Sequence, residues 1–154
     1  MNKVFLDTNL IVYANDARDA QKQARAIELI TAAMREGTGV ISTQVMQEYA
    51  VVAGGKLRQE PDTILRQLLL LETLEVVQIT PALIRRALEL QFRYQIDYWD
   101  AGILAAAEHA RCHLLWSEDL NPGQLYATVH VENPFAAPPK KKSKIGGGPK
   151  CPEA

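Results

Sequence analysis

Short apolar runs alternate with segments patterned like helices along residues 1–135. Five runs have the length and composition of strands, at residues 4–6, 40–41, 75–79, 114–116 and 128–131. Between the first four of them, apolar residues recur at helical spacing. Such alternation is typical of α/β proteins with right-handed crossovers. It predicts a three-layer α/β/α domain with a parallel five-stranded sheet.

The helices of this domain are expected at residues 10–13, 17–35, 44–53, 64–72, 81–94 and 97–109. Thr80 followed by Pro81 is a clear helix start, because threonine caps helices and proline suits the first helical position. Ser42 or Thr43 is a second expected N-cap, and Asp97 is a third.

Length and composition indicate one globular domain. The chain has 154 residues, of which 47% are hydrophobic and 23% charged. No apolar run approaches the roughly 20 residues that cross a bilayer, and the start of the sequence has no signal-peptide pattern. Cys112 and Cys151 lie in unlike surroundings, which argues against a disulfide framework or a zinc site. We expect a cytoplasmic protein without membrane contact.

The charge is unevenly distributed. Residues 138–154 contain five lysines and one glutamate out of 17 basic and 18 acidic residues, so the remainder holds 12 basic and 17 acidic residues, a net charge of −5. From residue 136 the sequence is rich in Pro, Lys and Gly, which predicts a disordered tail at 136–154 beside a domain at 1–135. An acidic domain is unsuited to binding nucleic acid by phosphate neutralisation alone. A metal ion could supply the positive charge.

Asp7 ends the first apolar run abruptly. In open α/β sheets, ligands bind beyond the carboxyl ends of the strands, where loops lead into helices. Asp7 is therefore a candidate functional residue. It could equally serve only as the N-cap of the next helix, and this stretch alone does not separate the two interpretations.

Three later acids fall at equivalent places: Asp119 after the fourth run, Glu48 on the helix after the second, and Asp100 at the start of the helix before the fourth. Each also has an ordinary explanation. Glu48 could be a solvated helix charge, Asp100 could complement a helix dipole, and Asp119 could belong to a turn. These explanations weaken because all the acids, Asp7 included, map to one predicted edge of the sheet.

Converging carboxylates cannot all remain ionised unless a cation compensates them. Hard oxygen ligands suit Mg²⁺ or Mn²⁺. Two such ions about 4 Å apart can activate a water molecule and stabilise the leaving oxygen in phosphodiester cleavage. The acids therefore predict metal-dependent phosphodiester hydrolysis.

Other chemistries find little support. His109, His113 and His130 lack metal-ligand spacing, and no Ser/His/Asp arrangement or phosphate-binding glycine motif is present. Trp99 and the other aromatic residues are too dispersed in sequence to indicate a base-stacking platform. Asn9 stands where haloacid-dehalogenase-like phosphatases need a second aspartate.

The sequence resembles PIN domains of the VapC type, the toxins of prokaryotic toxin–antitoxin pairs. The resemblance spans residues 1–135 and rests on four segments in this order: Val4-Phe5-Leu6-Asp7-Thr8-Asn9, Ser42-Thr43-Gln44-Val45-Met46-Gln47-Glu48, Tyr98-Trp99-Asp100-Ala101 and Leu115-Trp116-Ser117-Glu118-Asp119-Leu120, followed by Asn133-Pro134-Phe135. The segments are weak individually, but their order and spacing together are specific. The lysine-rich tail has no counterpart in the family pattern.

This resemblance implies an endoribonuclease that uses Mg²⁺ or Mn²⁺ to cut single-stranded or loop RNA. It implies that Asp7, Glu48, Asp100 and Asp119 form an acidic quartet, with Asn9 and Ser117 as supporting polar residues. It further implies a homodimer and a small antitoxin protein that blocks the site. The alternative hypothesis is a non-catalytic PIN-like module that binds RNA or a protein without cutting it.

Overall fold

The computed structural model describes residues 2–136, and alternating strands and helices account for most of them. Of the predicted tail, only Ala136 belongs to this range. The elements in chain order are β1 (Val4–Leu6), α1 (Thr8–Ala14), α2 (Ala20–Glu36), β2 (Gly39–Ser42), α3 (Thr43–Gly54), α4 (Pro61–Leu71), β3 (Glu75–Val77), α5 (Pro81–Tyr94), α6 (Tyr98–His109), β4 (Leu114–Trp116), β5 (Leu125–Tyr126) and β6 (Val129–Glu132).

The sheet has the strand order β3-β2-β1-β4-β6-β5, with β1 near its centre. Parallel pairing joins β3, β2, β1, β4 and β6, as the sequence predicted. The prediction of five strands was wrong by one, because β5 adds an antiparallel edge strand beside β6. The predicted fifth strand is therefore an inner strand, and the edge is formed by only two residues.

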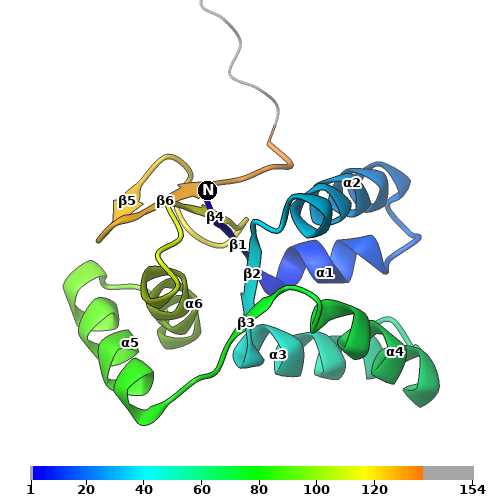
Figure 1. The fold of residues 1–154 in the computed structure, drawn as a ribbon, viewed down its shortest axis with the longest axis horizontal. Helices are drawn as coiled ribbons and strands as arrows, with labels where there is room; N and C mark the ends of the chain where they lie inside the picture. Colours follow the sequence, from blue (N-terminus) through cyan, green and yellow to red (C-terminus); the bar gives the residue numbers. More distant parts are fainter. Residues whose placement is uncertain (1, 137–154) are drawn as a thin grey trace, which may run out of the picture.

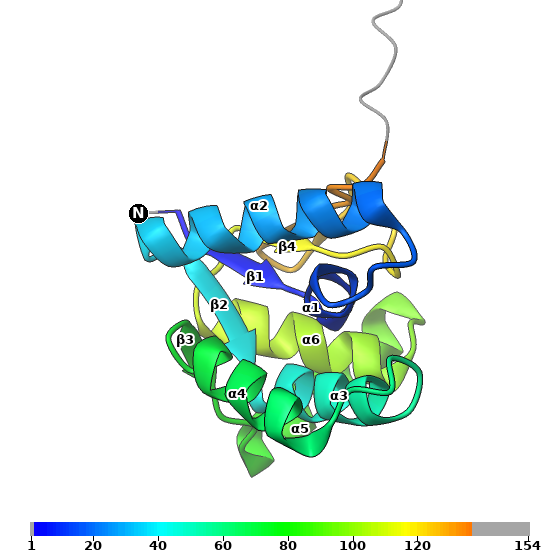
Figure 2. The ribbon, with the colours of Figure 1, turned by 90° about the vertical axis from the view of Figure 1, so that its right-hand side faces the viewer.

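The helices form layers on both sides of the sheet. Helices α1 and α2 lie on one side and α5 and α6 on the other, while α3 and α4 lie beyond the β2–β3 end (Figure 1). Viewed from the side, β1 points directly at α1, the helix that follows it (Figure 2). Both α1 and α6 contact α3. The three-layer α/β arrangement predicted from the sequence is confirmed.

Local side-chain contacts fix where the helices begin. Ser42 caps α3, Thr80 caps α5 and Asp97 caps α6, each accepting a backbone N–H of the first turn. Helix α2 begins later than predicted because Asp19 is its N-cap and accepts the N–H of Lys22. Helix α1 begins earlier than predicted, directly after Asp7.

The core lies where the central strands meet these helices. Phe5 and Leu115 are fully buried in adjacent strands, and Tyr49 of α3 is also completely buried. Burial of this kind is the main stabilising contribution to such a domain. Within residues 2–136, no helix combines the length and apolarity needed to cross a membrane.

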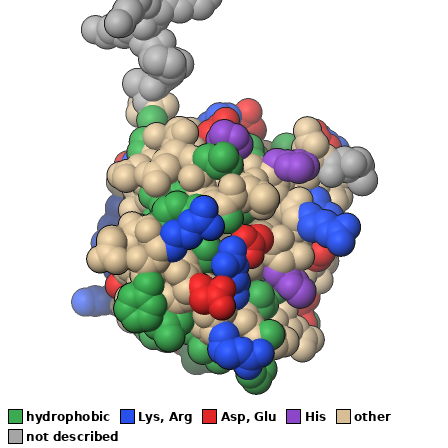
Figure 3. Space-filling view, turned by 90° about the vertical axis from the view of Figure 1, so that its left-hand side faces the viewer, with side chains coloured by type: hydrophobic (Ala, Val, Ile, Leu, Met, Phe, Trp, Pro, Cys, Tyr) green, Lys and Arg blue, Asp and Glu red, His purple; other side chains and the backbone are tan. Residues whose placement is uncertain are grey.

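The outer surface of α5 is mixed in character. Acidic, basic and hydrophobic side chains intermingle on the face of the molecule that carries this helix (Figure 3). Arg86 forms ion pairs with Glu108 of α6 at 2.8 Å and with Glu89 of α5 at 3.0 Å. The pair with Glu108 ties α5 to α6, the helix on which Asp100 lies.

Candidate active site

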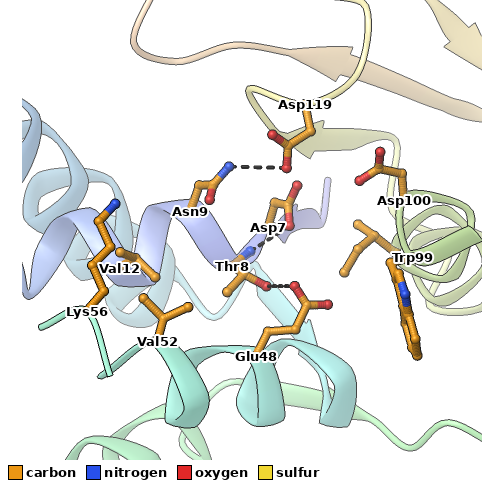
Figure 4. Close-up of a pocket in the computed structure, with 11 residues that line it drawn as sticks. Asp7, Thr8, Asn9, Val12, Glu48, Val52, Lys56, Trp99, Asp100 and Asp119 are labelled. Atoms are coloured by element: carbon orange, nitrogen blue, oxygen red, sulfur yellow. Dashed lines mark hydrogen bonds between the residues drawn. The ribbon is translucent and has the colours of Figure 1, made fainter. Parts of the chain in front are cut away.

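The four predicted acids line one cavity of about 190 Å³ at the carboxyl end of the central strands. Asp7, Glu48, Asp100 and Asp119 approach it from different directions (Figure 4). Each comes from a different segment: the β1–α1 junction, α3, α6 and the loop after β4. The expected convergence of these residues is therefore seen in the structure.

Asp7 is both a helix cap and a cavity residue. It occupies the N-cap position of α1, and its Oδ1 accepts the backbone N–H of Thr8 at 2.7 Å. Its Oδ2 accepts a hydrogen bond from Ser117 Oγ at 2.6 Å, and the side chain lines the cavity. The two interpretations left open by the sequence are thus compatible. Asp7 is only 4% exposed, and two donors hold its carboxylate in place.

Ser117 and Asn9 both form hydrogen bonds with acids of the cavity. Ser117 is fully buried directly after β4, and its Oγ also accepts the backbone N–H of Asp119 at 3.1 Å. Asn9 Nδ2 donates to Asp119 Oδ2 at 3.2 Å. These contacts connect Asp119 to Asp7 through one serine and tie it to the first turn of α1.

Glu48 is oriented by two neutral side chains. Thr8 Oγ1 donates to Glu48 Oε2 at 3.2 Å, and Gln44 Nε2 donates to Glu48 Oε1 at 2.7 Å. The same Gln44 nitrogen donates to the backbone carbonyl of Trp99 at 2.9 Å, linking α3 to the start of α6. Gly102 leaves room for this side chain, because a Cβ there would lie 2.5 Å from Gln44 Oε1 and would displace it.

Asp100 lies in the first turn of α6, on the side that faces the cavity. Ile103, one turn further along, lines the same cavity. Asp97 has a different position: its Oδ1 accepts the backbone N–H of Trp99 at 2.9 Å as the helix cap. The placements predicted for these two aspartates are both observed.

Burial and mutual repulsion disturb the protonation of the acids. The pKa of Asp7 is raised to about 7, chiefly by burial and also by the nearby charges of Asp119 and Glu48, while the hydrogen bonds from Ser117 and Thr8 act in the opposite direction. The pKa of Asp100 is raised to about 6, first by burial and then by the charges of Asp119, Asp97 and Glu48. The cavity therefore concentrates negative charge that its own residues leave uncompensated.

These shifts predict that stability without divalent metal falls as pH rises. The folded-state pKa values of Asp7 and Asp100, about 7 and about 6, exceed the unfolded value of about 3.9. The stabilising protonated state is thus complete below about pH 4 and lost as pH rises through 6 to 7. In EDTA, we expect a lower melting temperature at pH 8 than at pH 5.5. Asp7→Asn should remove much of this difference, and an unchanged slope in the variant would contradict the assignment to Asp7.

Within residues 2–136, no group of three acidic, histidine or cysteine side chains has the geometry to hold a metal ion. Asp7, Glu48 and Asp119 instead accept hydrogen bonds from the neutral donors described above: Thr8, Asn9, Gln44 and Ser117. His109, His113 and His130 are all exposed.

Six further cavity residues were not predicted from the sequence, among them the apolar Val12 and Val52. Thr8, Lys56, Trp99 and Ile103 also line the acidic cavity, and Lys56 is the one basic residue among the described residues that do so. In Figure 4, Lys56 and Trp99 lie at opposite ends of the cavity. The sequence could have indicated Trp99 as a cavity residue, because it directly precedes Asp100. Lys56 gave no such signal, since it follows two glycines and resembles an ordinary charged residue in a loop.

The family model of the PIN domain matches residues 4–126. This range is most of the chain and includes all four acids. The chain belongs to the PIN domain family. No curated protein sequence gives a significant match. The fold is also shared with solved structures of a bacterial VapC toxin, a toxin–antitoxin complex and a VapBC complex.

Three of these structures illustrate the similarity. A toxin–antitoxin complex from Klebsiella pneumoniae has a TM-score of 0.65 and 22% identity, covering 88% of this PIN domain protein and 100% of that chain. VapC20 of Mycobacterium tuberculosis, a toxin that cleaves the sarcin–ricin loop, has a TM-score of 0.62 and 18% identity, covering 76% and 90%. VapBC2 of Rickettsia felis, bound to promoter DNA, has a TM-score of 0.61 and 18% identity, covering 84% and 96%.

Proposed function

We propose that this PIN domain protein is an endoribonuclease that depends on Mg²⁺ or Mn²⁺ and cuts single-stranded or loop RNA. The observation that carries the proposal is the convergence of Asp7, Glu48, Asp100 and Asp119 on one cavity. A binding module has no need to gather acids that raise one another's pKa. The similarity in fold to VapC20, which cleaves an RNA loop, supports the same class of substrate.

The donor set suits a hard divalent cation. All four acids offer carboxylate oxygens. Burial and, after it, the neighbouring carboxylates raise the pKa values of Asp7 and Asp100, and a bound cation would offset both effects. Asp7, Asp100 and Asp119 are the proposed metal ligands, with Glu48 completing the site or orienting the attacking water. When bound, one or two such ions supply positive charge to the phosphate and lower the pKa of a water molecule.

The surrounding residues keep the acids in place for this chemistry. Ser117 and Thr8 hold the two oxygens of Asp7, so its carboxylate enters the reaction already oriented. Asn9 restrains Asp119 by donating to its Oδ2, so Asn9 does not occupy Oδ1 of the same carboxylate. Lys56, at one end of the cavity, can attract the RNA phosphate.

We further propose that the protein acts in the cytoplasm as the toxin of a toxin–antitoxin pair, as a homodimer that a cognate antitoxin inhibits. The complexes from Klebsiella pneumoniae and Rickettsia felis, which share its fold, support an antitoxin partner. In this proposal residues 1–135 form the nuclease domain, and the lysine-rich tail adds attraction for RNA.

The direct test is cleavage of labelled RNA by the purified protein. Stem-loop and single-stranded RNA should be cut with Mn²⁺ or Mg²⁺ and remain intact with EDTA, while duplex RNA of the same sequence should resist because its base edges are hidden. An Asp119→Asn variant prepared identically controls for contaminating ribonuclease. Cleavage that persists in EDTA or in this variant would overturn the proposal. RNA that is bound but never cut would support the non-catalytic alternative.

A further inference from the structure

A second cavity adjoins the acidic one and differs from it in chemistry. This groove, of about 480 Å³, is lined by Gln44, Gln47, Glu48, Val51, Val52 and Trp99. Its volume falls in the range of about 300–1,000 Å³ typical of small-molecule sites. Glu48, Val52 and Trp99 line both cavities, so the groove is continuous with the proposed cleavage site.

The groove exposes an unusual amount of apolar surface. Trp99 is 62% exposed and Val51 is 75% exposed, although both are large hydrophobic residues. Exposed tryptophan beside a polar site is typical of binding surfaces. Gln47 is also exposed and adds an amide that can donate and accept hydrogen bonds.

The backbone of Trp99 is fixed by hydrogen bonds on both sides, and its ring has one aromatic neighbour. Its backbone N–H donates to Asp97, and its carbonyl accepts the hydrogen bond from Gln44. Its ring packs edge-to-face against Tyr98, with centroids 5.2 Å apart. An aromatic ring that is already ordered loses little entropy when it binds a ligand.

The neighbouring charges indicate which part of an RNA strand would enter the groove. A phosphate is negatively charged, so it can approach the acidic cavity only beside a bound cation or the ammonium group of Lys56. Lys56 lies at the end of the cavity opposite Trp99 (Figure 4). A neutral, flat base has no such requirement, and stacking on an aromatic side chain is a standard way of binding one. The apolar groove therefore suits a base next to the reacting phosphate.

We propose that Trp99 stacks on one base of the RNA substrate beside the cleaved phosphate, with Val51 and Val52 forming the rest of the base site. This inference rests on the proposed ribonuclease function. Because stacking tolerates every base, it should select for an unpaired nucleotide more than for a sequence. The exposed amide of Gln47 can contact the edge of that base.

The first test compares three variants on a single-stranded RNA substrate. Trp99→Ala should raise KM about 5- to 100-fold, while Trp99→Phe should stay within about threefold of wild type because a stacking face remains. Phe92→Ala is the matched control, since Phe92 is 67% exposed on α5 and lines neither cavity. Melting temperatures confirm that the variants fold. Equal KM values for wild type and Trp99→Ala would overturn the proposal.

The second test separates stacking from a structural role. A series of RNA substrates, each with one abasic position, is assayed with wild type and Trp99→Ala. One abasic position should raise the wild-type KM strongly and leave the Trp99→Ala value unchanged, because both changes remove the same contact. If Trp99→Ala is impaired equally on every substrate, including all abasic ones, Trp99 only supports the site. If it instead alters elution volume in size-exclusion chromatography, a second copy of the chain occupies the groove.

A binding measurement distinguishes failure of this inference from failure of the proposed function. Trp116→Phe leaves Trp99 as the only tryptophan in the chain. Quenching of its fluorescence by single-stranded RNA in EDTA, and less quenching by the critical abasic RNA, would support stacking even if no cleavage occurs. Cleavage without any quenching would leave the ribonuclease function standing and overturn the base site.

Discussion

Asp7→Asn is expected to give a folded protein that cleaves RNA at least about 100-fold more slowly and no longer responds to Mn²⁺. Even residues that only support metal ligands cost about 10–100-fold in affinity or activity when substituted. The amide can still accept the N–H of Thr8, and it can donate to Ser117 Oγ in place of the present bond. The fold should therefore survive the loss of charge.

The same variant should be more stable than wild type when metal is absent. At pH 8, ionised Asp7 opposes folding by at most about 4 kcal/mol, because its pKa rises from about 3.9 to about 7. Mn²⁺ at 100 times its Kd should stabilise wild type by about 2.7 kcal/mol and the variant much less. Single-turnover cleavage and melting temperature, each with Mn²⁺ and with EDTA, measure both effects.

Asp16→Asn is the matched control for this experiment. Asp16 is also a buried aspartate, but it pairs with Arg18 at 2.8 Å and does not line the acidic cavity. Its loss should lower stability and leave cleavage and the Mn²⁺ response unchanged. A metal response that is equal in wild type and Asp7→Asn would remove the metal site from the proposed mechanism.

Asp100→Asn should likewise lower the rate of RNA cleavage at least about 100-fold, while Asp97→Ala should leave most of that rate intact. The two aspartates lie one helical turn apart but have different contacts. Asp100 faces the cavity, whereas Asp97 accepts the N–H of Trp99 as the cap of α6. Removing that cap should cost about 1 kcal/mol of stability and keep most of the activity.

Cleavage rate and melting temperature of both variants decide this assignment. Asp97→Ala should melt lower than wild type, and Asp100→Asn should melt at or above the wild-type temperature because a charge with a raised pKa is removed. If Asp97→Ala were inactive but well folded and Asp100→Asn were active, the acid that α6 contributes to the site would be Asp97 and not Asp100.

The parallel sheet and its caps were predictable because their signals are local. Buried strands such as Val4–Leu6 are continuous apolar runs, and Thr80-Pro81 marks a helix start by its own chemistry. Strand β5 was missed because Leu125–Tyr126 is only two residues long. Its turn to β6 includes Ala127 at a φ of 52°, where a glycine or asparagine would have been the usual signal.

The convergence of the acids was predictable from topology, but the contacts that orient them were not. Knowing that strand ends share one edge was enough to bring Asp7 and Asp119 together. That Gln44 bonds both Glu48 and the carbonyl of Trp99 depends on how α3 and α6 pack together, and on the space that Gly102 leaves for the Gln44 side chain. Trp99 was set aside because aromatic residues are scattered in sequence, yet one ring suffices when the fold places it beside the cavity.

The pairing of β1 with β4 has a consequence for when the protein can become active. Val4 pairs with Leu114, and Asp7 takes its hydrogen bond from a serine 110 positions later. Translation proceeds from the N-terminus, so Asp7 leaves the ribosome long before its partners in β4 and the following loop have been made. The nascent chain therefore cannot assemble the acidic quartet until residue 119 is synthesised. In the proposed ribonuclease, cleavage of the message being translated would therefore have to wait until nearly the whole domain has emerged.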